Sequence, residues 1–246
     1  MDRMIYVAMS GAKQTAIAQG LNSNNLANAN TTGFRQDLAD MRSMPVYGPG
    51  APSRVYAMAE RPSVDLNNGV MQATGRELDV AIQGQGWLAV QAADGSEAYS
   101  RRGDLRIESG GLLVNGSGQP VLGEGGPIAI PQAESLEIGT DGTITVRGIG
   151  QNPSVLTVVD RIRLVNPDPA QLEKGKDGLM RLAGGATAPA DAAVQLISGA
   201  LEGSNVNTVD AMVNMIALAR QYETQVKMMK TAGDLENSAN ELLSLT

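Results

Sequence analysis

Apolar residues repeat at helical spacing near the start of the chain. Ile5, Met9, Ala12 and Ala16 follow one another at steps of four, three and four residues. This spacing places them on one face and predicts a helix over residues 3–28. Alanine and glycine are frequent beside that face, so we expect another helix to approach it closely.

A second, longer helical pattern occupies residues 204–244, and Ser204-Asn205 is its expected N-cap. The steps between its apolar positions average close to 3.5 residues, which is the spacing of a coiled coil. At about 1.5 Å per residue this helix would be roughly 60 Å long. Methionines add a second apolar face, and a helix with two apolar faces needs partners on two sides. The apolar positions are Val209, Val213, Ile216, Ala219, Tyr222, Val226, Met229, Ala232, Leu235, Ala239 and Leu242.

The sequence between these helices has a different pattern. Residues 36–75 are rich in proline and have few periodic runs, which predicts an extended connector with short strands. Residues 76–200 alternate short β-rich runs such as LDVAIQ and WLAVQA with turn dipeptides such as Asp94-Gly95. We therefore expect an α+β chain with a helix and turn over 1–35, a connector over 36–75, a β domain over 76–200 and a helix over 201–246. The terminal helices are expected to pair as a coiled-coil core domain, with the all-β domain inserted between them.

Composition excludes several functional classes. The net charge is −7 and no basic cluster is present, which argues against nucleic-acid binding. The chain has no Cys and no His, so disulfides, thiol catalysis and the commonest metal ligand are missing. We expect no cleaved signal peptide and no membrane insertion, because the apolar run near the start is short and no apolar stretch is long enough to span a bilayer.

Candidate catalytic patterns are weak. Asp65, Glu77 and Asp79 lie close in sequence, but a cleft lined by aromatic residues is not expected with a single Trp. The glycines of GQGWLAV precede a strand rather than a helix, so they favour turns and bulges over a nucleotide loop. We expect no catalytic residue, cofactor or metal site. The 12 methionines instead suit surfaces that pack against other chains, although an ordinary core is the alternative.

Three stretches together resemble the flagellar basal-body rod and hook proteins. They are NLANANTTGF at residues 25–34, TGRELDVAIQGQGWLAV at 74–90 and LEGSNVNTVDAMVNMIALARQYETQVKMM at 201–229. The length and the opening MDRMIYVAMSGA are most similar to a proximal rod protein, and a distal rod protein is the alternative. Trp87 and Leu88 stand where the family often has Phe.

The resemblance implies a structural subunit of the bacterial flagellum rather than an enzyme. Such subunits are exported by the flagellar type III apparatus without a cleaved signal, and they polymerise in the periplasm into a hollow helical tube. The tube transmits torque and conducts exported proteins. Implied partners are further copies, homologous rod proteins, the export apparatus with its chaperones, and surrounding ring proteins. Two other classes compete with this interpretation. An enzyme would be a folded, active monomer with a cleft around Asp or Glu, and a secreted adhesin or binding module would be a stable soluble monomer with ordered ends.

The asparagine-rich run is expected to cap the first helix, close a turn at Gly33 and bond across subunit seams, while being solvated in a free monomer. The expected assembly interface of the helical core comprises Ile5, Met9, Ala12, Ala16, Asn25, Asn28, Asn30, Gly33, Phe34, Val209, Val213, Ile216, Tyr222, Val226, Met229, Leu235 and Leu242.

Overall fold

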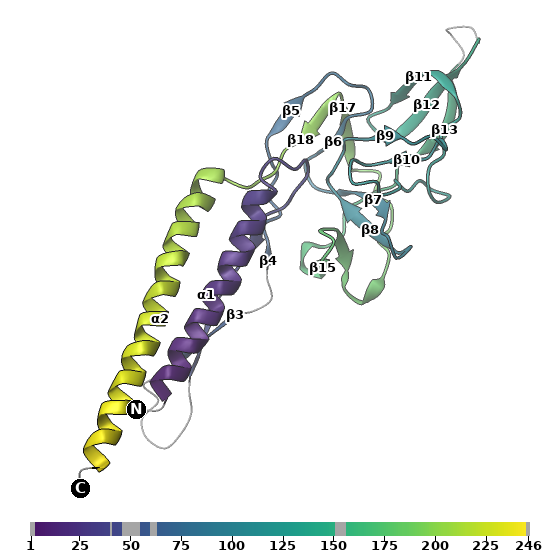
Figure 1. Cartoon of the computed structure of the whole chain (residues 1–246). Helices are drawn as coiled ribbons and strands as arrows, with labels where there is room; N and C mark the ends of the chain where they lie inside the picture. The colour runs from purple at the N-terminus through teal and green to yellow at the C-terminus, as the bar shows by residue number, and fades with distance from the viewer. Residues whose placement is uncertain (1–2, 40, 46–54, 60–62, 151–155, 245–246) are drawn as a thin grey trace. The chain divides into compact units, whose positions relative to one another are not determined.

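The computed structural model describes residues 3–39, 41–45, 55–59, 63–150 and 156–244 (Figure 1). The chain divides into two compact units. Unit 1 comprises Met1–Ala29, Gln36–Asp65 and Val206–Thr246, and unit 2 comprises Asn30–Arg35 and Leu66–Asn205. Each unit therefore contains segments that are far apart in sequence.

Unit 1 is built on two long helices, α1 (Arg3–Ala27) and α2 (Thr208–Ser244). They run antiparallel and side by side, as Figure 1 shows. The Asn22 side chain donates to the Ala211 carbonyl at 2.7 Å, and Gly11 lies opposite Gln225, where an added Cβ would come within 3.0 Å of that side chain. The glycine thus permits close approach of the second helix, as the abundance of small residues predicts.

The start of α2 differs from the prediction. The expected cap at Ser204-Asn205 is wrong, because the helix begins at Thr208. The Asn207 carboxamide oxygen accepts from the Val209 amide at 3.0 Å, and its Nδ2 donates to Asp210 at 2.7 Å. Asn207 therefore caps the free amides of the first turn, and Asp210 adds negative charge where the helix dipole favours it.

The helix faces that meet inside unit 1 follow a heptad. On α1 the buried residues are Ala8, Ala12, Thr15, Ala18, Asn22 and Asn25. On α2, Ala211 and Ala232 are buried, and Met215, Leu218, Gln225 and Met229 are half-buried at the same spacing. We call these two sets the inner faces. Steps of three and four residues keep such positions on one side of a helix.

The first part of the connector, residues 36–65, belongs to unit 1, and its remaining residues 66–75 belong to unit 2. Strand β1 (Asp37–Leu38) pairs with β4 (Ser63–Val64), and β2 (Met41–Pro45) pairs with β3 (Val55–Ala59), both antiparallel. Strand β3 packs against α1.

Unit 2 consists of short antiparallel strands in its described residues, with two 3-10 turns, η1 (Pro169–Gln171) and η2 (Ala183–Gly185). The largest sheet has the order β14 (Leu164–Val165), β7 (Trp87–Gln91), β8 (Glu97–Ser100), β16 (Met180–Leu182) and β15 (Leu172–Lys174). A second sheet has the order β11 (Ala133–Ile138), β12 (Thr143–Gly148) and β13 (Thr157–Arg161). Three ribbons pair β17 (Gln195–Ser198) with β6 (Val80–Gln83), β18 (Ala200–Glu202) with β5 (Met71–Ala73), and β10 (Leu113–Val114) with β9 (Arg106–Ile107).

The core of unit 2 is aliphatic. Leu105, Leu113, Ile128 and Ile144 are fully buried in one cluster contributed by several strands. The predicted α+β class is confirmed by the two helices and the many strands. No helix within the described ranges is both long and apolar enough to cross a membrane.

Candidate assembly interface

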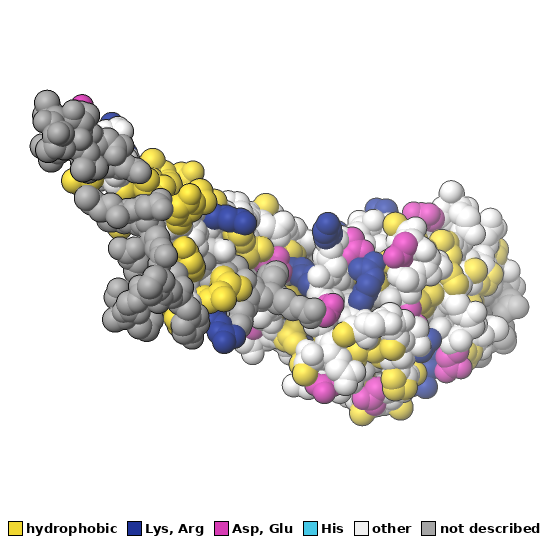
Figure 2. Space-filling view, turned by 90° about the horizontal axis from the view of Figure 1, so that it is seen from below, with side chains coloured by type: hydrophobic (Ala, Val, Ile, Leu, Met, Phe, Trp, Pro, Cys, Tyr) yellow, Lys and Arg dark blue, Asp and Glu magenta, His cyan; other side chains and the backbone are white. Residues whose placement is uncertain are grey.

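The outward side of α2 carries a run of exposed apolar side chains. Val209, Met212, Val213 and Ile216 are 67%, 54%, 62% and 57% exposed. They lie about half a turn from the inner face of α2, because a helix advances by about 100° per residue. We call these four residues the outer patch. Figure 2 shows hydrophobic side chains at the surface of the helical unit.

The outer patch is unusual for the surface of an isolated chain. A contiguous exposed apolar surface commonly marks a protein or membrane interaction site. Burying one such side chain is worth about 1.5–3 kcal/mol. The patch therefore has the chemistry of a contact with another apolar surface.

The remaining predicted positions on α2 differ in exposure. Val226 and Leu235 are exposed, and Tyr222 is 40% exposed, whereas Met229 lies on the inner face. Leu242 falls within α2, but its side chain lies outside the described residues.

On α1 the pairing face differs from the one that the sequence predicts. Ala12 is buried and Ile5 is half-buried, but Met9 is 52% exposed and Ala16 is also exposed. The prediction that Met9 and Ala16 share the face that pairs with the C-terminal helix is therefore wrong. Smaller residues occupy that face because they allow close helix packing, which leaves Met9 outside.

Asn25 is the most buried residue of the asparagine-rich run. It is 2% exposed, its Nδ2 donates to the Asp37 carbonyl at 2.8 Å, and its Oδ1 accepts from the Asp37 amide at 2.9 Å. The expectation that this residue is solvated in a single chain is wrong, because its amide completes the backbone bonding of β1. Asn28 donates to the Asn24 carbonyl at 2.9 Å, and Asn30 is exposed.

Sequence reasoning missed Asn22, which is 8% exposed and bonded to the α2 backbone. The signal was its position three residues before Asn25 and seven after Thr15, which continues a heptad into the polar run. Buried polar groups in such positions fix helix register.

Gly33 and Phe34 make their described contacts inside unit 2. The Gly33 amide donates to the Glu202 carbonyl at 2.8 Å, and the Asn205 amide donates to the Phe34 carbonyl at 3.3 Å. The ammonium of Lys174 lies 4.1 Å from the centroid of the Phe34 ring, within the range of a cation–π contact. The turn after α1 is thus docked on the β unit of its own chain.

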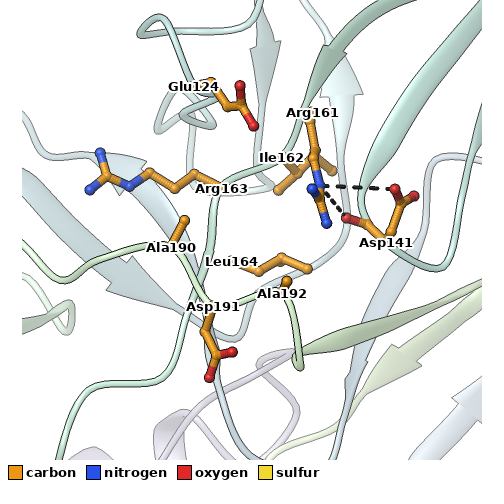
Figure 3. A pocket seen from close by; sticks show the side chains of 9 residues that line it. All are labelled: Glu124, Asp141, Arg161, Ile162, Arg163, Leu164, Ala190, Asp191 and Ala192. Atoms are coloured by element: carbon orange, nitrogen blue, oxygen red, sulfur yellow. Dashed lines mark hydrogen bonds and ion pairs between the residues drawn. The ribbon is translucent and has the colours of Figure 1, made fainter.

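Unit 2 has a pocket of about 270 Å³ that is lined by charged and apolar side chains (Figure 3). Arg161 turns toward Asp141 and donates to its backbone carbonyl at 2.9 Å. The pKa of Asp141 is lowered chiefly by the hydrogen bond from the Thr143 side chain, so this carboxylate is a poor general base. Among the residues that the structure describes, no three acidic side chains cluster as a metal site would require. The lining residues are Glu124, Asp141, Arg161, Ile162, Arg163, Leu164, Ala190, Asp191 and Ala192.

Comparison with protein families gives three matches that follow one another along the chain. Residues 5–35 match the flagella basal body rod protein family, and residues 81–146 match the D1 domain of flagellar hook protein FlgE/F/G. Residues 197–242 match the C-terminal part of the flagellar basal body rod FlgEFG proteins.

Individual relatives extend the similarity over the full length. The chain is 43% identical to flagellar basal-body rod protein FlgF of Escherichia coli K12 over 100% of both chains. It is 42% identical to FlgF of Salmonella typhimurium LT2, also over 100% of both. It is 31% identical to FlgG of Bacillus subtilis 168, over 96% of this chain and 97% of that protein. The chain therefore belongs to the flagellar basal-body rod protein family, and within it this chain is most like the proteins named FlgF.

Proposed function

We propose that this protein is a structural subunit of the proximal rod of the flagellar basal body, and that its outer patch packs against neighbouring rod subunits. Full-length identity of 43% to a FlgF protein supports the proximal role, and the identity to the FlgG relative is lower, at 31%. The observation that carries the assembly role is the outer patch, four apolar side chains each more than half exposed on one side of α2.

The helical hairpin of unit 1 is the core domain in this proposal. Its inner faces pair as an antiparallel coiled coil, and its outer surfaces are left for other copies and for homologous rod proteins. Tyr6, Met9 and Ile17 are exposed on α1 and offer a second apolar surface. A subunit that contacts neighbours on two sides needs two outward apolar surfaces, and each helix provides one.

Assembly follows from symmetry. When two different surfaces of one chain meet head to tail, the contacts generate an open helix unless the rotation closes a ring. Repetition would build the hollow periplasmic tube through which torque and exported proteins pass. Unit 2 is then an inserted β domain that the tube carries.

A complementation experiment tests this function. A host that lacks its own FlgF-type protein should assemble basal bodies and swim when it expresses this chain. The paired substitution Val213→Asp and Ile216→Asp should abolish both, because it places charge in the middle of the outer patch. The control Asn214→Asp adds a charge on the same helix outside the patch and should retain motility.

Two results would count against the proposal. The first is full motility in the Val213→Asp, Ile216→Asp chain at normal protein level. The second is failure of the unmodified chain to enter basal bodies although it is expressed and exported.

A further inference from the structure

The most buried charges of the described residues meet in unit 2. Glu202 is 1% exposed, its Oε1 lies 2.8 Å from Arg35 Nη1, and its Oε2 lies 2.9 Å from Arg101 Nη1. Both arginine side chains are at most 3% exposed. One buried carboxylate therefore pairs with two buried guanidinium groups.

Trp87, the only tryptophan of the chain, packs against the same pair of arginines. The guanidinium carbons of Arg35 and Arg101 lie 5.9 and 5.4 Å from its ring centroid. Arg101 also donates to the Gly84 carbonyl at 2.7 Å, which ties it to the turn before β7. We call Arg35, Arg101, Glu202 and Trp87 the latch.

The latch holds segments that are distant in sequence. The guanidinium of Arg35 donates to the Asn67 carbonyl and, at 3.1 Å, to Asn68 Oδ1. The Gly69 amide donates to Glu202 Oε1 at 2.9 Å. Residues 30–35, residues 67–69 and the end of β18 therefore share one set of polar contacts. The first leads from α1 and the last leads toward α2 along the chain.

Glu202 is the carboxylate that joins the two arginines, and it pairs with both buried guanidinium groups. Burial lowers the pKa of Arg101 against the opposing effect of Glu202. An uncompensated buried guanidinium is strongly unfavourable, and two would also repel each other. Without the carboxylate we expect Arg35 to leave, because it lies on a short segment that is separated in sequence from the rest of unit 2.

We propose that the latch couples the two ends of unit 2, so that residues 30–35 stay docked only while the segment around Glu202 is docked, and the converse. Such coupling is reciprocal by thermodynamic necessity. In synthesis from the N-terminus, Glu202 is the last member to appear. The latch can therefore close only in a chain that is complete through β18. Residues 30–35, which follow α1, dock stably only once unit 2 is complete. The latch acts within a single copy and does not depend on assembly.

The direct test is Glu202→Gln in the full-length chain, measured by amide hydrogen exchange and Trp87 fluorescence. The Gly33 amide bonds to the main-chain carbonyl of residue 202, which the substitution preserves. Its exchange should nevertheless accelerate about a hundredfold, because the latch opens. Trp87 emission should shift to the red. The Val121 amide, bonded to the Leu113 carbonyl in the core, should keep its protection.

A second variant tests reciprocity and stays informative if Glu202→Gln does not fold. Arg35→Met leaves a matched pair of Arg101 and Glu202, and should be milder. It should still accelerate exchange at the Gly203 amide, which bonds to the Val70 carbonyl and is not a partner of Arg35. Asp177→Asn is the control, because it breaks the exposed ion pair with Arg181 and should change neither readout.

Unchanged Gly33 protection in a folded Glu202→Gln chain would overturn the proposal. So would an Arg35→Met chain in which exchange rises within residues 30–35 while Gly203 stays as protected as before.

Discussion

Gly33 shows how one residue fixes the path of the chain after α1. Its φ is +67°, and an added Cβ would lie 2.3 Å from the carbonyl carbon of Arg101. We expect Gly33→Ala to destabilise unit 2 by about 2–3 kcal/mol, because both the left-handed conformation and the clash oppose it. Gly75→Ala is the control, with a φ of +71° but open space around the position, and should cost only about 1 kcal/mol. Urea unfolding followed by Trp87 fluorescence measures both, and equal losses would refute the argument from close approach.

Tyr99 gives a prediction that depends on pH. Its hydroxyl accepts from the Ala188 amide at 2.7 Å and donates to Glu97 at 3.0 Å, and the side chain is 1% exposed. Tyr99→Phe should cost about 1–3 kcal/mol near neutral pH, because the buried Ala188 amide loses its acceptor.

Burial raises the pKa of Tyr99 to about 12. The folded state therefore favours the neutral phenol. Its contribution is complete below the ordinary tyrosine pKa of about 10 and is lost as the pH rises toward 12. The urea midpoint of the natural chain should exceed that of Tyr99→Phe at pH 8, and the difference between the two midpoints should be smaller at pH 11. A difference that grows with pH would contradict this assignment.

At the scale of elements, the helices could be predicted from apolar spacing, but their contact faces could not. Met9, Val213 and Ile216 are large and apolar. Their spacing is the same whether they contact another subunit or are buried within their own chain, so it does not identify the contact face. The inner face of α1 uses small or polar residues such as Ala8, Ala12 and Asn22, because the close approach of the helices leaves little room. The α+β class and the approximate extent of both helices could be predicted from the sequence. The docking of residues 30–35 could not, because it depends on contacts between Arg35 and Glu202, which are far apart in sequence.

The two faces of α2 should respond differently to substitution in the free chain. Ala211 is 3% exposed on the inner face, so Ala211→Leu should overpack it and cost about 1–3 kcal/mol. Val213→Asp on the outer patch should change the stability of the monomer by no more than about 0.5 kcal/mol. Thermal unfolding by circular dichroism compares them, and a larger loss from Val213→Asp would place the outer patch inside the free subunit.

At the scale of the whole molecule, the division into two units predicts independent folding. Residues 30–35 belong to unit 2, which ends at Asn205. The described backbone hydrogen bonds that hold these residues lie within unit 2. Removal of residues 206–246 should therefore leave unit 2 folded while α1 loses its partner and assembly is abolished. Retained protection of the Val121 amide together with lost helical circular dichroism is the expected result. Loss of Val121 protection would show that unit 2 depends on α2.

Cysteine accessibility tests the central claim most directly, because the chain has no Cys of its own. A single Val213→Cys should react rapidly with a water-soluble maleimide in the free subunit and be protected in isolated basal bodies, while an exposed Asp94→Cys in unit 2 corrects for general access. Protection of Val213→Cys that appears only on assembly is the predicted result. Equal labelling before and after assembly would contradict the claim that the outer patch is buried between rod subunits.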